Sequence, residues 1–210
     1  LARVLCGGRV SLLCGIAIIA IAFVLGAIIG GIAGFIGGKV DTILMRIVDA
    51  LMAVPPALLA MAIITALGNG VFNLVVALAI AQIPRFARTV RSSVLTLRNM
   101  EYVEAAKCYG SSSMRIILKH ILPNGIGPIV VAATLTLGAV ILSISSMGYL
   151  GLGVASPTPE WGTIISENKI NIRYYPYLGL IPGLCIMFTV MAVNFIGDGL
   201  RDAFDPKSKN

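Results

Sequence analysis

Charged side chains are scarce in this sequence, and long stretches have none. They make up 12% of the 210 residues, whereas hydrophobic residues make up 58% and the mean hydropathy is +0.95. A soluble domain carries about 25% charged residues, so this composition excludes an ordinary water-soluble globule. Four stretches have no charged side chain: residues 10–38, 50–84, 124–159 and 174–197. Each is longer than the roughly 20 apolar residues that a membrane-spanning helix needs.

The second of these stretches is long enough for two helices, and Gly68-Asn69-Gly70 divides it. Glycine and asparagine accept the backbone conformations of a tight turn. The sequence therefore predicts five membrane spans, at about residues 10–37, 47–67, 71–90, 124–147 and 176–198. None has an ionisable group near its centre, and none alternates apolar with polar residues as barrel strands do. We expect an all-α integral membrane protein with a single transmembrane domain over residues 1–210.

The motifs of several enzyme classes are also missing. Gly38-Lys39 is followed by Val40 and lacks the upstream glycine of a P-loop, so the chain has no such site for ATP. His120 is the only histidine, and neither HExxH nor CxxC occurs, which leaves no credible catalytic triad, zinc site or disulfide framework. We therefore expect a protein that is not an enzyme and that binds no metal or cofactor itself.

Positive charge gathers in one segment. Residues 85–119 contain seven Lys or Arg side chains but only two Glu side chains: Arg85, Arg88, Arg91, Arg98, Lys107, Arg115 and Lys119, with Glu101 and Glu104. Short cytoplasmic loops are rich in Lys and Arg, so we expect a cytoplasmic loop over 91–123. Alternation then places 39–49 and the tail 201–210 inside, and the turn at 68–70 and the segment 148–175 outside. This topology accounts for the net charge of +7, which gives no support to nucleic-acid binding.

The first expected span has small residues at four-residue intervals: Ala22, Gly26, Gly30 and Gly34. Residues at this spacing lie on one face of a helix. Small side chains allow two helix backbones to approach closely in lipid, so we expect another helix to pack tightly on this face.

The cytoplasmic loop has the pattern of two short helices. Helix-forming residues fill 98–109, and Gly110 stands where a glycine commonly ends a helix. Ser111 or Ser112 can cap a second helix that includes 114–118. Such a pair either lies on the lipid headgroups as an amphipathic unit or binds a cytoplasmic partner.

The loop contains Glu104-Ala105-Ala106, three residues, Gly110, nine residues, His120, one residue and Leu122-Pro123. This arrangement resembles the EAA motif of the permease subunits of binding-protein-dependent ABC importers. His120 stands where the general motif has isoleucine, and the run from His120 to Asn124 resembles the dipeptide, oligopeptide and nickel branch of that family. The resemblance covers essentially the whole chain.

The resemblance implies the helical bundle of a type I ABC importer permease, without the family's N-terminal cytoplasmic stretch and first span. It also implies that the loop forms coupling helices that dock into an ATPase, through these residues: Glu104, Ala105, Ala106, Gly110, Leu122 and Pro123. The implied partners are a homologous second permease subunit, two ABC ATPase subunits that hold ATP and Mg²⁺, an extracytoplasmic substrate-binding protein and membrane lipid. The implied location is the bacterial plasma (inner) membrane.

The outer segment is rich in proline and aromatic residues. A short helix is expected to start at Trp161 and to extend through Asn168, after two prolines that prevent a helix. Three tyrosines follow within 174–177. Tryptophan and tyrosine prefer the membrane interface, so the segment either forms an aromatic belt or, as the resemblance implies, docks the binding protein through Glu160 and Trp161.

The substrate path has only weak candidates. Four polar side chains in or near the spans are candidate pore residues: Gln82, Thr134, Ser143 and Asn194. Each is also suited to a hydrogen bond between helices. The spans have no cluster of histidines or carboxylates, which favours peptides over nickel as the substrate. A nickel or glutathione permease, a secondary carrier and a purely structural membrane subunit stay as alternatives.

Overall fold

The computed structural model describes residues 1–204, and the side chains of Lys107 and Met114 lie outside the description. The part of the expected tail from 205 to 210 also lies outside it. The regular elements of the described part are helices: α1 (Ala2–Ile36), α2 (Gly38–Met52), α3 (Pro56–Leu67), α4 (Val71–Leu97), α5 (Glu101–Cys108), α6 (Ser113–Ile116), the π-helical turn η1 (Ile117–Ile121), α7 (Leu122–Asn124), α8 (Ile126–Tyr149), α9 (Trp161–Asn168) and α10 (Tyr177–Phe204).

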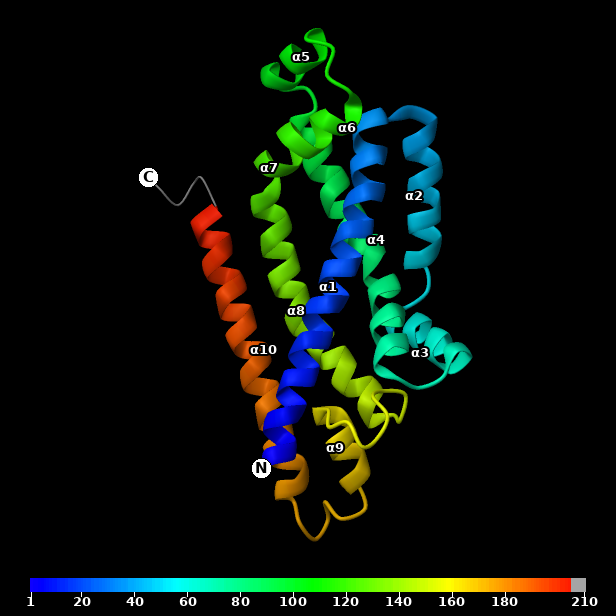
Figure 1. Cartoon of the computed structure of the whole chain (residues 1–210), viewed down its shortest axis with the longest axis vertical. Helices are drawn as coiled ribbons and strands as arrows, with labels where there is room; N and C mark the ends of the chain where they lie inside the picture. The colour runs from blue at the N-terminus through cyan, green and yellow to red at the C-terminus, as the bar shows by residue number, and fades with distance from the viewer. Residues whose placement is uncertain (205–210) are drawn as a thin grey trace.

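Four helices, α1, α4, α8 and α10, are long and apolar enough to cross a membrane, and the bent pair of α2 and α3 can supply a fifth crossing. The four long helices run along the long axis of the molecule (Figure 1). The short helix α5 lies at one end, and α9 lies at the other, close to the N-terminus. We call these the α5 end and the α9 end. The described chain therefore has the expected all-α membrane fold.

The span expected over 47–67 is not one straight helix. It is divided between α2 and α3, which are bent by 83° at their junction. Pro55 and Pro56 lie at this junction, where a proline ring clashes with a continuing helix and supplies no N–H group. The residue before a proline is also pushed out of the helical region, and Pro55, with ψ 130°, precedes Pro56. Both prolines lie in a run without charges, so hydropathy alone does not locate the bend.

The segment expected as a cytoplasmic loop over 39–49 is also helical. α1 ends at Ile36, and α2 begins two residues later at Gly38. Gly37 and Gly38 have φ values of 71° and 58°, a left-handed conformation that glycine adopts without strain. The chain can therefore reverse within these two residues, and α2 runs back beside α1 (Figure 1).

The small-residue stripe of α1, over 22–34, packs on α4 as a close helix contact. A methyl group added at Gly26 would lie 2.5 Å from the Cβ atom of Phe86. One added at Gly30 would overlap the backbone carbonyl oxygen of Ala87. The predicted tight packing is confirmed, because only residues this small allow the two backbones to approach so closely.

α4 is longer than the span expected over 71–90. It continues to Leu97, and Pro84 lies inside it without ending it. The first cations of the expected cytoplasmic loop therefore belong to a helix, and the irregular part begins at Arg98. α1 likewise begins before the span expected over 10–37, and α10 continues past the end of the span expected over 176–198.

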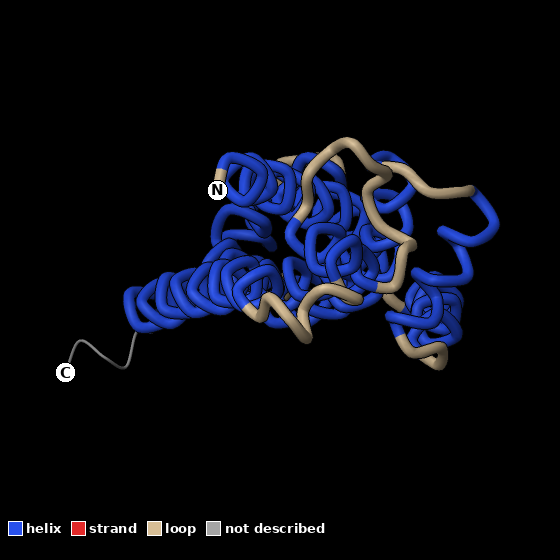
Figure 2. The backbone as a smooth tube through the Cα atoms, turned by 90° about the horizontal axis from the view of Figure 1, so that it is seen from below, coloured by secondary structure: helices blue, strands red, loops and turns tan. Residues whose placement is uncertain are grey.

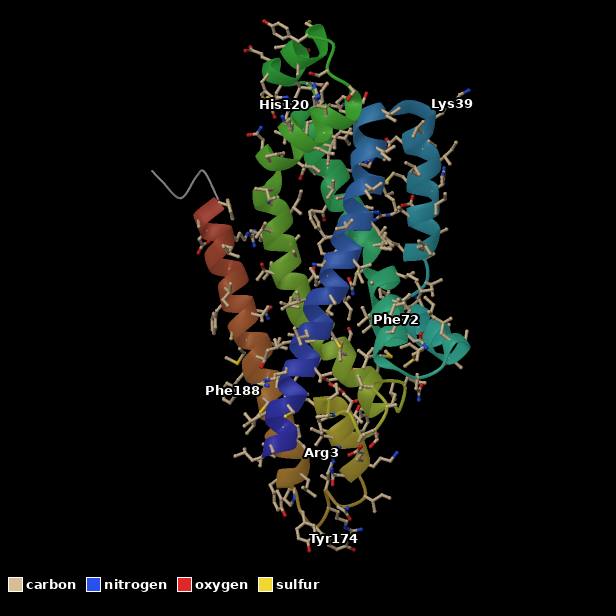
Figure 3. The ribbon with its side chains drawn as sticks, in the orientation of Figure 1. Arg3, Lys39, Phe72, His120, Tyr174 and Phe188 are labelled. Carbon is tan, nitrogen blue, oxygen red and sulfur yellow. The ribbon has the colours of Figure 1, made fainter. Side chains whose placement is uncertain are left out.

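α10 is the least enclosed of the long helices. Seen from the α9 end, it extends away from the rest of the bundle toward the C-terminus (Figure 2). Phe188 and Phe195 are 60% and 69% exposed, and Phe188 lies on the outer side of the helix (Figure 3). In a chain that crosses a membrane, lipid or another subunit covers such an apolar face.

Candidate functional site

α5 is held against the bundle by one side only. Val103 and Ala106 are buried. They belong to an apolar cluster with residues of α4, α6, η1 and α8: Val90, Val94, Ile116, Ile121 and Ile129. On the other side, Glu104 and Ala105 are exposed, and Tyr109, directly after the helix, is 90% exposed. α5 therefore offers a free surface of small, acidic and aromatic residues at the end of the molecule (Figure 1).

Gly110 follows α5 as the sequence predicts for a helix-ending glycine, with a φ of 75°. The N–H group of Ser111 donates to the carbonyl oxygen of Ala106 at 3.1 Å. The N–H group of Tyr109 donates to the carbonyl oxygen of Ala105 at 3.0 Å. The bond from Ser111 to Ala106 spans the left-handed glycine as in a Schellman motif, whereas the bond from Tyr109 is the last ordinary helical bond before it. Most other residues are strained in this conformation, so the direction in which the chain leaves α5 depends on Gly110.

Pro123 lies where the chain returns to the bundle. In the π-helical turn η1, the N–H group of Leu122 donates to the carbonyl oxygen of Ile117, five residues earlier. Pro123 has no N–H group with which to continue an α-helical pattern. The side chain of Asn124 donates to the carbonyl oxygen of His120 at 2.6 Å. The segment 120–124 thus forms the joint between η1 and α8, and π-helical turns are frequent at functional sites.

Two arginines connect α4 to neighbouring helices at the α5 end: Arg91 lies within α4, and Arg98 is its C-cap residue. Arg98 donates from Nη1 to the carbonyl oxygen of Gly34, near the end of α1, at 2.9 Å. Arg91 donates from two nitrogens to the carboxylate of Asp41 in α2, at 2.6 Å each. Two-pronged pairs of this kind are strong and fix the geometry of both groups. α1, α2 and α4 are therefore joined next to the segment that carries α5.

The candidate pore residues lie on three helices. Thr134 and Ser143 of α8 each donate at 2.9 Å to a carbonyl oxygen of their own helix. The side-chain oxygen of Asn194, in α10, lies so close to Gly138 of α8 that a methyl group there would be 2.9 Å from it. Gln82 is half-buried on α4. Their role in a substrate path stays a prediction.

Two apolar grooves run along α1. One, of about 320 Å³, lies between α1 and α8, and Thr134 is the only polar residue that lines it. The other, of about 520 Å³, lies between α1 and the η1–α7 segment. Neither offers a charged group for the termini of a peptide, so an apolar occupant fits both. Among the described residues, no three His, Cys, Asp or Glu side chains form a group that could hold a metal ion.

The structure buries two residues that were expected on a docking surface. Glu160 is 0% exposed and Trp161 is 5% exposed. The Glu160 carboxylate accepts the N–H group of Thr163 at 2.9 Å and so caps α9. The indole Nε1 of Trp161 donates to the carbonyl oxygen of Val4 at 2.9 Å. Both side chains contribute to internal contacts here, whereas the short helix itself, Trp161–Asn168, begins and ends as predicted.

Exposed residues of the α9 end also follow α9 in the chain. Ile170 is 81% exposed and Tyr174 is 75% exposed. Tyr174 lies at the extreme tip of the molecule, beyond Arg3 (Figure 3). We call residues 169–177 the α9 tip. A docking role for Glu160 and Trp161 stays a prediction, and in this chain the α9 tip is an exposed surface at this end.

The fold and these two ends can be compared with known proteins. Residues 11–210 match the family described as "Binding-protein-dependent transport system inner membrane component". The chain belongs to this family. It is therefore a permease subunit of an ABC importer, and it lies in the bacterial inner membrane as a multi-pass protein. The resemblance based on the segment 104–123 is confirmed.

Curated relatives match this permease over nearly its whole length. It is 45% identical to the "Dipeptide transport system permease protein DppC" of Alkalihalophilus pseudofirmus, over 99% of this chain and 68% of that protein. It is 41% identical to the "Di/tripeptide transport system permease protein DppC" of Pseudomonas aeruginosa, over 100% of this chain and 69% of that protein. It is 42% identical to the "Glutathione transport system permease protein GsiD" of Pectobacterium atrosepticum, over 99% of this chain and 69% of that protein.

A solved structure supports the same fold for this permease. A chain of the MetNI methionine ABC transporter superposes on it with a TM-score of 0.78 at 21% sequence identity. The superposition covers 97% of this permease and 96% of that chain. The expected type I permease bundle is confirmed.

Proposed function

We propose that this permease forms the translocation path of an importer of short peptides, and that partner ATPases drive it through α5. The position of α5 carries the proposal, because this helix stands at the end of the bundle with one side free (Figure 1). Exposed Ala105 permits the close approach of a partner, and exposed Glu104 supplies a charge for a polar contact beside it. The conformation of Gly110 sets the orientation of the helix.

Three connections transmit a movement of α5 to the long helices. Val103 and Ala106 belong to the apolar cluster that also contains Val90 and Val94 of α4. Arg98 connects the end of α4 to α1 through the Gly34 carbonyl oxygen. The segment 120–124 leads directly into α8. Packed interfaces switch between arrangements rather than deforming continuously, so closure of the ATPases changes the bundle and opens the path alternately to each side.

The energy source and the delivery of substrate lie in other subunits. The chain has no P-loop, so ATP and Mg²⁺ are bound by two ABC ATPase subunits at the α5 end. A homologous second permease subunit completes the path and covers part of the apolar surface, for which the exposed side of α10 is suited. A substrate-binding protein delivers peptides at the α9 end, where the α9 tip is exposed.

Short peptides are the substrate class that the relatives support. Their names specify dipeptides, di/tripeptides and glutathione, which is itself a tripeptide. Nickel fits less well, because the described residues contain no group of metal-ligating side chains. Competition between a labelled dipeptide and glutathione for uptake decides between the two peptide alternatives.

The substitution Ala105→Trp tests the contact at α5. Ala105 is exposed, so the bulky ring leaves the fold intact and occupies the surface where the ATPase binds. We expect ATPase co-purification and dipeptide uptake into proteoliposomes to fall by about tenfold or more, which corresponds to roughly 1.4 kcal/mol of lost binding. Ala62→Trp, at an exposed position of α3, is the matched control.

Normal uptake by the Ala105→Trp complex would contradict the assigned contact. Uptake that needs no ATPase subunit and follows a proton gradient would instead support a secondary carrier. A chain that assembles with its partners but never affects the flux of any peptide would support a structural subunit.

A further inference from the structure

A buried carboxylate lies inside the bundle at the α9 end. Among the charged side chains that the structure describes, Glu160 is the one that is fully buried, at 0% exposure. It precedes α9, which packs beside the N-terminal part of α1 (Figure 1). Charged groups in such surroundings are costly and are retained where they have a function. The coupling role proposed for α5 does not use it.

Glu160 connects three helices through hydrogen bonds. Its Oε1 accepts from the hydroxyl of Ser11 in α1 at 3.2 Å and from the hydroxyl of Ser145 in α8 at 3.2 Å. Its Oε2 accepts from the backbone N–H group of Thr163 in α9 at 2.9 Å and from the Thr163 hydroxyl at 3.3 Å. We call these four residues the Glu160 hub. Ser11, Ser145 and Thr163 are themselves buried, at 0%, 5% and 9% exposure.

The surrounding backbone is shaped around the hub. A methyl group added at Gly148, in α8, would overlap Oε2 of Glu160, and one added at Gly162 would overlap the carbonyl oxygen of Ser145. Two glycines therefore bring the backbones of α8 and α9 into direct contact around the carboxylate. Such close contact leaves no room for a layer of water between the two helices.

Further bonds attach α9 at both of its ends. Near its start, Trp161 donates to the carbonyl oxygen of Val4 in α1 at 2.9 Å. Near its end, Glu167 forms an ion pair with Arg3 of α1 at 2.7 Å. The hydroxyl of Ser166 donates to the last residue of α8 at 2.8 Å. α9 is thus bonded to α1 and to α8 along its whole length.

These bonds oppose independent movement of α9. A buried polar network in which every group is paired makes its surroundings rigid, whereas separating it leaves a buried carboxylate without donors. We propose that Glu160 is a positioning residue that fixes α9 to α1 and α8, so that these three helices move as one rigid body during transport. The inference rests on the proposed function, because transport is what moves the bundle.

The rigid body links the two ends of the permease. α1 carries Ser11 of the hub near one end and Gly34, the partner of Arg98, near the other. These residues are 23 positions apart, about 35 Å along a helix. A partner that binds the α9 tip therefore acts directly on helices that contact the segment beside α5. Because of Glu160, α9 does not open and close by itself, and a force applied to it by a partner passes to α1 and α8.

The first test tethers α9 to α1. Arg3→Cys and Glu167→Cys are introduced after the four native cysteines, Cys6, Cys14, Cys108 and Cys185, are replaced by alanine, and the pair is joined by a cleavable bifunctional thiol reagent. In the assembled transporter we expect dipeptide uptake to stay within about twofold of the untreated value, since helices that do not separate are unaffected by a tether. Each single-cysteine variant, treated identically, is the control. A loss of uptake that is reversed by cleaving the tether would overturn the proposal.

The second test weakens the attachment of α9 but keeps Glu160 as its N-cap residue. Ser11→Ala with Ser145→Ala removes the bonds that Glu160 accepts from α1 and α8 but keeps the bond from the Thr163 N–H group to Glu160. We expect the amides of α9 to exchange hydrogen about tenfold faster in the assembled complex, while those of α5 are unchanged. Basal ATP hydrolysis stays the same, and its stimulation by the binding protein is lost. A general structural defect would lower both basal ATP hydrolysis and its stimulation by the binding protein.

The matched control removes two hydroxyls that bond only within their own helices. Thr65 and Ser146 donate to the carbonyl oxygens of Met61 and Leu142, so Thr65→Ala with Ser146→Ala should exchange and hydrolyse as the wild type does. Unchanged exchange of α9 in the hub variant, or retained stimulation, would overturn the proposal. Hydrogen exchange requires no substrate, so a failure of peptide uptake in the wild type would count against the proposed function alone.

Discussion

The guanidinium of Arg91 holds the carboxylate of Asp41 by two nitrogen–oxygen contacts of 2.6 Å between α4 and α2. The two side chains are only 32% and 17% exposed. α2 has a single fully buried side chain, Val48, so this ion pair is its main polar attachment to the bundle. Asp41 was expected in a cytoplasmic loop, but it lies in α2 and attaches this helix to α4.

Breaking this ion pair should destabilise the permease. Arg91→Gln leaves the partly buried carboxylate of Asp41 without its charged donor, and we expect a loss of roughly 1.5–3 kcal/mol in the free energy of unfolding. Arg88→Gln is the control, because the pair of Arg88 with Asp49 is about half exposed, at 50% and 49%. Such a pair contributes at most about 1 kcal/mol. Thermal unfolding in detergent measures the stability of both variants. Equal losses of stability would show that the partial burial of the Arg91–Asp41 pair does not strengthen it.

The sequence predicted the features that depend on one residue type or on spacing along one helix. The left-handed turn at Gly110 follows from the preference of glycine for that conformation. The close contact of the stripe over 22–34 follows from its four-residue spacing. The start of a helix at Trp161 follows from the prolines before it. Each of these rules is local, so the sequence alone sufficed.

Features that join distant segments could not be predicted in this way. Asp41 and Arg91 are 50 residues apart, and Ser11 and Glu160 are 149 residues apart. Nothing in the sequence of either segment identifies its partner. Glu160 was expected on a surface that docks the binding protein, as the resemblance implied. Ser11 and Ser145 are polar residues in otherwise apolar runs, but neither run indicates that the two hydroxyls meet at one carboxylate.

Gly30 should tolerate no side chain. The Cβ atom of an alanine there would overlap the carbonyl oxygen of Ala87, so the two backbones would have to separate. We expect Gly30→Ala to destabilise the permease by about 1–3 kcal/mol, the usual cost of overpacking. Gly31→Ala is the matched control, because its Cβ atom would lie an ordinary 3.4 Å from Ile117. If both variants unfold at the same temperature, the close approach of α1 and α4 is wrong.

The fluorescence of Trp161 should report its burial. It is the only tryptophan and is 5% exposed, so emission at short wavelength and weak quenching by iodide are expected. In Gly8→Ala the new methyl group would lie 2.8 Å from the ring, which must shift. For Gly8→Ala we therefore expect the emission of Trp161 to shift to longer wavelength and its quenching by iodide to increase. Gly183→Ala, with no atom within 4 Å of the new methyl group, serves as the control. Strong quenching in the wild type would contradict the burial of Trp161.

Two substitutions at Gly110 separate conformation from size. The residue has a φ of 75°, and no atom lies within 4 Å of an added methyl group, so conformation alone limits the side chain. Asparagine enters this region fairly readily, whereas most other residues lose roughly 1–2 kcal/mol there and a β-branched residue is strained most. We therefore expect dipeptide uptake and ATP hydrolysis by the assembled complex to decrease from glycine to Gly110→Asn to Gly110→Val. Membrane insertion and the unfolding temperature of the bundle should stay unchanged, because nothing packs on this position. Equal transport by the two variants would mean that the direction in which the chain leaves α5 does not matter for coupling.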